Sequence, residues 1–150
     1  MIKTKVSVEI RRPVPEVFAF VTRVENFPAW FGEIVAESRQ TPPGPIGVGA
    51  TFTQTHHFLG RRFTSHFTVT AYERDRLFCV STRQGLVPFQ GCFSFELIPG
   101  GTRLTDQHEI NPKGFFGLVG SLLVGRLRQQ ADTNLATLKR LLEGTIIKEQ

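Results

Sequence analysis

Two side chains that could carry acid–base chemistry, Asp106 and His108, lie two residues apart in a segment where polar and apolar residues alternate. Side chains at positions i and i+2 of a β-strand share one face, so the carboxylate could orient the imidazole. The imidazole could then accept a proton near neutral pH as the general base of an enzyme. A polar patch at a water-exposed sheet end accounts for the same two residues, so both interpretations stay open.

A third candidate base is His56, which is followed directly by His57. Neighbouring residues of a strand point to opposite faces, so at most one of the two can join Asp106 and His108. Catalytic and structural zinc sites take three or four converging ligands, and we expect no metal site here. The glycines fall in turn-like segments, and no phosphate-binding loop or dinucleotide-binding motif occurs, so we expect no cofactor.

The elements that must position these side chains follow from the hydrophobic periodicity. Residues 2–11 alternate like a half-buried strand. Two short helices follow, one within 12–21, which opens with prolines, and one at 27–31 with Asn26 as its expected N-cap. Residues 34–39 predict another strand, and residues 50–112 predict an antiparallel meander of five strands. Three- and four-residue spacing after residue 112 predicts a long amphipathic helix that stops near Gly144.

The predicted inward faces of the strands are rich in phenylalanine and are interrupted by polar residues. Phe occurs 14 times in the chain, whereas Tyr and Trp occur once each. Because Phe has no polar atom that needs a partner, it suits either a packed core or the wall of an apolar pocket. The inward residues are Phe52, Gln54, His56, Phe58, Phe63, Ser65, Phe67, Val69, Phe89, Gly91, Phe93, Phe95, Leu97, Leu104, Asp106, His108 and Ile110.

Length and composition favour one globular domain over residues 1–150. Apolar residues make up 40% of the chain and charged residues 21%, and no run of about 18 apolar residues predicts a membrane span. The N-terminus lacks the apolar stretch of a secretory signal, so we expect a cytoplasmic location.

Cys79 and Cys92 would face each other if the turn between their strands were at residues 85–86. The sequence does not fix that register, and a reducing compartment favours free, buried thiols.

The positive charge is dispersed rather than clustered. The formal net charge is +5 and the pI about 9.8, but the basic residues come as separated pairs, which is typical of a solvated surface. We therefore expect no nucleic-acid partner. Peripheral contact with a membrane stays open, through Phe115 and Phe116 beside Lys113 and Arg126.

Several stretches together resemble the START-like, Bet v 1-like superfamily (SRPBCC), and in particular its polyketide cyclase/dehydrase-like branch. The order of one strand, two short helices, six strands and a long helix is the order of that family's helix-grip fold. The resemblance covers nearly the whole chain, and its motifs concern turns and core positions, which specify fold better than activity. The matching stretches are residues 12–18, 24–30, 47–52, 69–73, 100–105 and the closing leucine-rich helix.

The resemblance implies an α+β fold in which a seven-stranded, curved antiparallel sheet surrounds the C-terminal helix. In relatives the cavity between them receives lipids, sterols, polyketides, quinones or plant hormones. We expect this chain to bind a hydrophobic small molecule in a cavity of about 300–1,000 Å³. The alternative is a polyketide cyclase/dehydratase-like enzyme acting in the same cavity, with His56, Asp106 and His108 as its candidate catalytic residues. The sequence leaves the ligand's identity and the oligomeric state open.

Candidate ligand-binding residues follow from placing this sequence on that fold, although side-chain packing in the core accounts for each of them equally well. We expect residues 114–120, the second short helix and the loop at 42–49 to form the mouth of the cavity. The candidates are Phe27, Trp30, Phe31, Phe52, Gln54, His56, Phe67, Phe93, Asp106, His108, Phe116, Val119 and Leu123.

Overall fold

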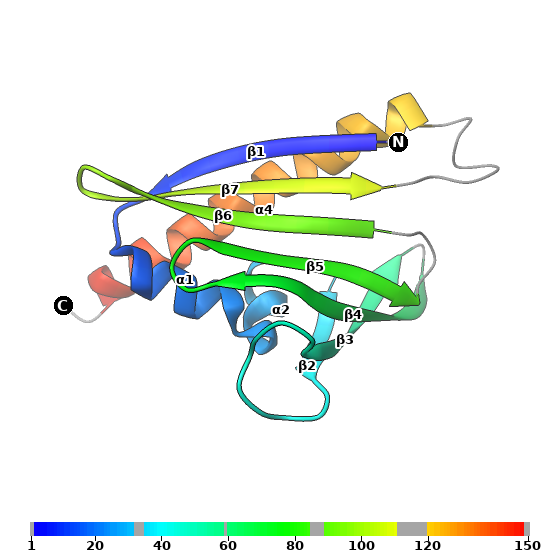
Figure 1. Ribbon diagram of the computed structural model, residues 1–150. Coiled ribbons are helices and arrows are strands. Elements are labelled where there is room, and N and C mark those ends of the chain that lie inside the picture. The colour runs from blue at the N-terminus through cyan, green and yellow to red at the C-terminus, as the bar shows by residue number, and fades with distance from the viewer. Residues whose placement is uncertain (1, 32–34, 59, 85–88, 111–119, 149–150) are drawn as a thin grey trace.

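A curved antiparallel sheet with helices against one face dominates the computed structural model, which describes residues 2–31, 35–58, 60–84, 89–110 and 120–148 (Figure 1). The strands are β1 Ile2–Ile10, β2 Val35–Gln40, β3 Thr51–Phe58, β4 Arg61–Glu73, β5 Leu77–Gln84, β6 Phe89–Ile98 and β7 Gly101–Ile110. They pair in the order β1-β7-β6-β5-β4-β3-β2. The predicted seven strands and the meander from β3 to β7 are confirmed, and β1 and β2 form the two edges.

The helices that cover the sheet are α1 Val14–Thr22, the 3₁₀ turn η1 Val24–Asn26, α2 Phe27–Trp30 and α4 Gly120–Lys148. Strand β1 lies at one edge and β2 at the other, so the segment from α1 to α2 carries the chain across the sheet. None of the helices in the described part of the chain has the length and hydropathy needed to cross a membrane. The α+β helix-grip architecture predicted from the sequence is confirmed.

The core lies between the concave face of the sheet and these helices. Val17 and Val21 of α1 and Trp30 of α2 are completely buried. They belong to the same apolar cluster as Phe52 and Leu104 of the sheet. Buried residues recur at every second position in β6 and β7, and this is the period that the sequence analysis used.

Helix α4 buries one stripe of side chains, with Ala131, Leu135 and Leu138 at the spacing of a helix face. Three polar contacts join its C-terminal half to the end of β1 and to the β1–α1 connection. Lys139 Nζ donates to the Glu9 carbonyl at 2.6 Å, Arg12 Nε donates to the Leu142 carbonyl at 3.0 Å, and the Arg11 amide donates to Glu143 Oε2 at 2.9 Å. These contacts set where α4 crosses the sheet.

Two local expectations are wrong, and a third holds only in part. Gly144 does not end α4, because it keeps a helical backbone and does not adopt the positive φ of a helix-terminating glycine. Asn26 occupies the N-cap position of α2 as predicted, but its side chain makes no capping hydrogen bond; it lies in η1, and its Nδ2 donates to the Phe20 carbonyl at 3.1 Å. Leu97 is 79% exposed rather than inward, because it lies near the tip of the β6–β7 hairpin, which extends past the other strands in Figure 1.

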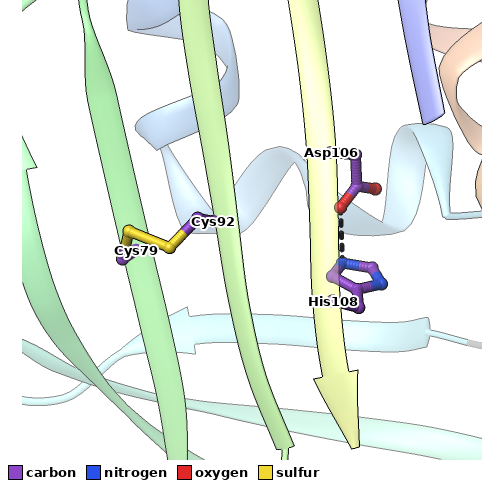
Figure 2. Close-up of a disulfide and its surroundings, with 4 residues drawn as sticks. All are labelled: Cys79, Cys92, Asp106 and His108. Atoms are coloured by element: carbon purple, nitrogen blue, oxygen red, sulfur yellow. Dashed lines mark ion pairs between the residues drawn. A yellow bond between two sulfur atoms is a disulfide. The ribbon is translucent and has the colours of Figure 1, made fainter. Parts of the chain in front are cut away.

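The expectation of free thiols is also wrong, because Cys79 and Cys92 form a disulfide. The two residues are directly opposite each other in the β5–β6 ladder, with Cα atoms 4.1 Å apart. Figure 2 shows the bridge joining these two strands. The sequence argument failed because it inferred the thiol state from an expected compartment, whereas the register of the hairpin decides whether the sulfur atoms meet.

Replacing both Cys79 and Cys92 with serine should lower the free energy of unfolding by about 3 kcal/mol. The disulfide joins residues 13 positions apart, and a cross-link closing a loop of about this length removes that much chain entropy from the unfolded state. Urea unfolding followed by circular dichroism measures the change. A reducing agent should shift the wild-type midpoint similarly and leave the double variant unchanged. Equal midpoints for wild type and variant would contradict the disulfide.

Candidate functional site

A cavity of about 320 Å³ lies between the sheet and α4, at the low end of the predicted size range. Its wall comes from β2 to β7, from the residue that follows α2, and from the part of α4 that precedes its anchored half. The described residues that line it are Phe31, Val35, His56, Phe63, Ser65, Phe67, Thr82, Phe89, His108, Ile110, Leu127, Gln130, Ala131 and Asn134.

A larger hollow, of about 610 Å³, is a groove on the outside of α1 rather than a space under the sheet. Charged side chains of Arg23, Glu25, Arg74 and Asp75 surround it. We place the candidate site in the smaller cavity, because its described lining is mainly apolar and aromatic, with a few polar groups and no Lys, Arg, Asp or Glu, as suits a small-molecule site.

A row of four aromatic rings runs along the sheet side of the cavity, with a histidine at each end. The ring centroids of His56 and Phe67 are 6.3 Å apart, those of Phe67 and Phe89 are 6.0 Å apart, and those of Phe89 and His108 are 4.9 Å apart. The four residues come from β3, β4, β6 and β7. The row therefore offers an apolar surface bounded by two groups that can form hydrogen bonds.

Two residues beside this row affect the position of its rings: Gly91 leaves space for them, and Thr82 holds the start of β6. Gly91 is directly opposite His108 in the β6–β7 ladder, and a Cβ atom at Gly91 would lie 2.9 Å from both His108 Cδ2 and Phe89 Cζ. A side chain at this inward position would displace both rings. On β5, Thr82 Oγ1 accepts a hydrogen bond from the Phe89 amide at 2.9 Å and so fixes the start of β6 beside the cavity.

Asp106 and His108 come together as the sequence analysis expected of side chains on one face. Their side chains lie on the same side of β7 in Figure 2, with Oδ1 and Nε2 2.6 Å apart. The Asp106 side chain is 1% exposed and that of His108 is 17% exposed. Among the described residues Oδ1 has no aligned hydrogen-bond donor, so the contact is an ion pair when His108 is protonated. The buried carboxylate therefore sets the orientation of the imidazole ring.

His56, at the other end of the row, has a different environment. Its Nε2 atom is buried and has no hydrogen-bond partner among the described residues. Burial lowers the pKa of His56 below its ordinary value, because desolvation disfavours the imidazolium. The imidazole is therefore neutral at neutral pH, when one ring nitrogen donates and the other accepts a hydrogen bond.

Helix α4 contributes two polar residues that the sequence analysis missed. Gln130 Nε2 donates to Asn134 Oδ1 at 2.8 Å, one helical turn further on, and both residues line the cavity. Their positions provided a signal, since 127, 130, 131 and 134 follow the spacing of the buried stripe. Polar residues within a buried helix stripe indicate that this part of the helix faces a cavity rather than the packed core. Thr82 and Val35 were also missed, because no inward face was assigned to β5 and β2.

The structure divides the predicted ligand-binding residues into three groups. Phe31, His56, Phe67 and His108 line the cavity. A second group is buried without lining it, and within that group Gln54 Nε2 donates to Ser38 Oγ at 3.4 Å. The others in it are Phe27, Trp30, Phe52, Phe93 and Asp106. Phe116, Val119 and the side chain of Leu123 lie outside the described residues, as do 114–119 of the predicted mouth and the predicted membrane contact at Phe115 and Phe116.

The loop at 42–49, also predicted as part of the mouth, contributes none of the described lining residues and instead borders surface hollows on the outside of the molecule. Phe31, which directly follows α2, does line the cavity. Of the predicted mouth elements in the described part of the chain, the second short helix is therefore the one that reaches the site.

Solved structures with the same fold include several small proteins. TTHA0849 from Thermus thermophilus superposes with a TM-score of 0.80 at 14% identity, covering 95% of this chain and 98% of that one. Ara h 8.0201 has a TM-score of 0.72 at 13% identity, with 95% and 97% covered. The Aha1 dimer from Colwellia psychrerythraea has a TM-score of 0.66 at 17% identity, with 95% and 97% covered. At these identities the likeness concerns the fold alone.

The family comparison is more specific. None of the curated proteins matches the sequence. The family described as polyketide cyclase/dehydrase and lipid transport matches residues 1–143. This match covers nearly the whole chain and agrees with the START-like, Bet v 1-like resemblance of the sequence. The chain therefore belongs to the polyketide cyclase/dehydrase and lipid transport family.

Proposed function

We propose that this protein binds a hydrophobic small molecule in the cavity between the sheet and α4. The observation that carries the proposal is the aromatic row from His56 to His108 beside a cavity of about 320 Å³. Membership of a family that includes lipid transport supports the same class of ligand.

The size of the cavity limits the ligand. A water molecule occupies about 30 Å³ in the liquid, so the cavity corresponds to about ten water volumes. This volume suits a compact ring system or one short chain better than a diacyl lipid. Burying about ten methylene equivalents would contribute about 8 kcal/mol before the entropy of association is subtracted. Micromolar binding therefore needs little help from polar groups.

A second candidate function is supported by the contact between Asp106 and His108. With Nε2 turned toward the carboxylate, Nδ1 is the nitrogen that could take a proton from a carbon next to a ligand carbonyl. The electron pair of that C–H bond would pass to the carbonyl oxygen as an enolate, and Asp106 would stabilise the imidazolium. Such a step begins the cyclisation or dehydration of a polyketide.

Filling the cavity from the helix side should weaken binding of an apolar probe. Ala131 lines the cavity and is 3% exposed, so Ala131→Phe should weaken binding of the neutral dye N-phenyl-1-naphthylamine about tenfold or more. The matched control is Ala136→Phe, at an exposed position of the same helix, which should bind the dye like wild type. Fluorescence titration gives the affinities, and thermal unfolding shows whether each variant is folded. Equal affinities in the two folded variants would contradict the proposed site.

The enzyme alternative has its own test. If His108 is a general base, the wild type should turn over an enolisable polyketide mimic many times, and His108→Gln should lose about 10²–10⁴-fold of that rate. Product formation followed by mass spectrometry measures the turnover. Absence of turnover by a wild type that binds the mimic would favour a binding protein.

Gly91→Ala should impair the same site from the sheet side. The new methyl group would push the rings of Phe89 and His108 into the cavity, so dye binding should weaken, with a loss of about 1–3 kcal/mol of stability from overpacking. Gly125→Ala is the control, because a Cβ there meets nothing within 4 Å on the exposed side of α4. It should leave binding unchanged and raise helix stability. Wild-type affinity in Gly91→Ala would show that the row does not border the ligand.

A further inference from the structure

We infer that His56 determines specificity in this cavity by bonding to an uncharged hydroxyl group of the ligand, and that the cavity discriminates against carboxylates. This inference rests on the proposed function, since it concerns the same site. It goes further by assigning the ligand a chemical group and a binding partner in the protein.

The first step is the unsatisfied nitrogen of His56. Nε2 is buried, lacks a partner among the described residues, and belongs to a side chain that lines the cavity. Its neighbours cannot pair with it: Val35 and Phe63 are opposite it on the two adjacent strands, and Phe67 lies next to it in the row. A buried polar atom left without a partner destabilises the empty site. A ligand that supplies the missing hydrogen bond removes that destabilisation.

The second step concerns charge. None of the described lining residues is Lys, Arg, Asp or Glu, and the second imidazole of the wall, that of His108, already faces the Asp106 carboxylate at 2.6 Å. Among these residues a ligand carboxylate would therefore find no cation that is not already paired. Burial also disfavours the protonated form of His56. Bringing a charged group into such surroundings without a partner is costly. The polar group that fits is therefore uncharged.

The third step selects among uncharged groups. A neutral imidazole presents Nε2 either as donor or as acceptor, depending on which nitrogen holds the proton. A hydroxyl group both donates and accepts, so it bonds to Nε2 in either tautomer, whereas a ketone can only accept. The apolar body of the ligand would then lie along Phe67 and Phe89, whose positions next to His56 allow ring–ring contact.

The test uses three probes that differ in one group: 2-naphthol, naphthalene and 2-naphthoic acid, titrated by calorimetry at pH 7.5. In wild type, 2-naphthol should bind more tightly than 2-naphthoate. The ratio of the 2-naphthol affinity to the naphthalene affinity should fall about tenfold in His56→Leu, the equivalent of one net hydrogen bond. Naphthalene itself should bind wild type and His56→Leu about equally.

Two variants complete the design. His57→Leu alters the exposed neighbour on the opposite face of β3 and should keep the wild-type ratio. His56→Gln keeps an uncharged group that can donate and accept, so it should restore part of the 2-naphthol preference, and it replaces His56→Leu if that variant fails to fold. Thermal unfolding checks each protein.

The outcomes separate this inference from the proposed function. If naphthalene binds while the ratio is unchanged in His56→Leu, or if 2-naphthoate binds most tightly, the inference is overturned and the proposed function stands. If no probe binds wild type, including naphthalene, the proposed site itself fails. If the ratio of 2-naphthol to naphthalene affinity falls in His56→Leu and is retained in His57→Leu, the result supports His56 as the residue that bonds to the hydroxyl group.

Discussion

The packing of α4 onto the concave face of the sheet is the contact on which the rest of the structure depends. A curved sheet with an apolar inner face needs cover, and here one long helix crosses it while α1 and α2 fill the remaining side. Lys139, Arg12 and Glu143 tie the C-terminal half of α4 to the end of β1 and to the β1–α1 connection. Because that half is fixed, the preceding part of the helix, around Ala131, spans a space that it does not fill.

The cavity is thus a consequence of side-chain size as well as of topology. Gly91 on the sheet and Ala131 on the helix contribute almost no side-chain volume, and Ser65 and Thr82 add little more. Elsewhere on the same face, Phe52 is buried in the packed core. Gly91 leaves room for the His108 ring, which lies directly opposite it in the β6–β7 ladder.

Much of this fold could be predicted from the sequence, because strand alternation and helical spacing are local properties. The meander and the inward orientation of His56, Asp106 and His108 followed from a period of two residues. The division of inward residues into cavity wall and packed core did not follow. Phe52 and Phe67 stack on each other from adjacent strands with centroids 5.0 Å apart, yet only Phe67 lines the cavity, since the outcome depends on what covers each ring. The Cys79–Cys92 disulfide was missed for a different reason: the thiol state was inferred from an expected compartment, although the sequence allowed the register that places the two residues opposite each other.

The topology also decides which strands end the sheet. An edge strand presents unpaired backbone groups that can recruit another strand, and natural proteins blunt such edges with short length, irregularity or charge. Strand β2 has six residues and a register shift between Val35 and Glu37. Strand β1 carries Lys3, Lys5 and Glu9 on its solvent-exposed positions. Both edges are therefore poor templates for strand addition, and an open sheet with an apolar inner face is protected against growing into a larger aggregate.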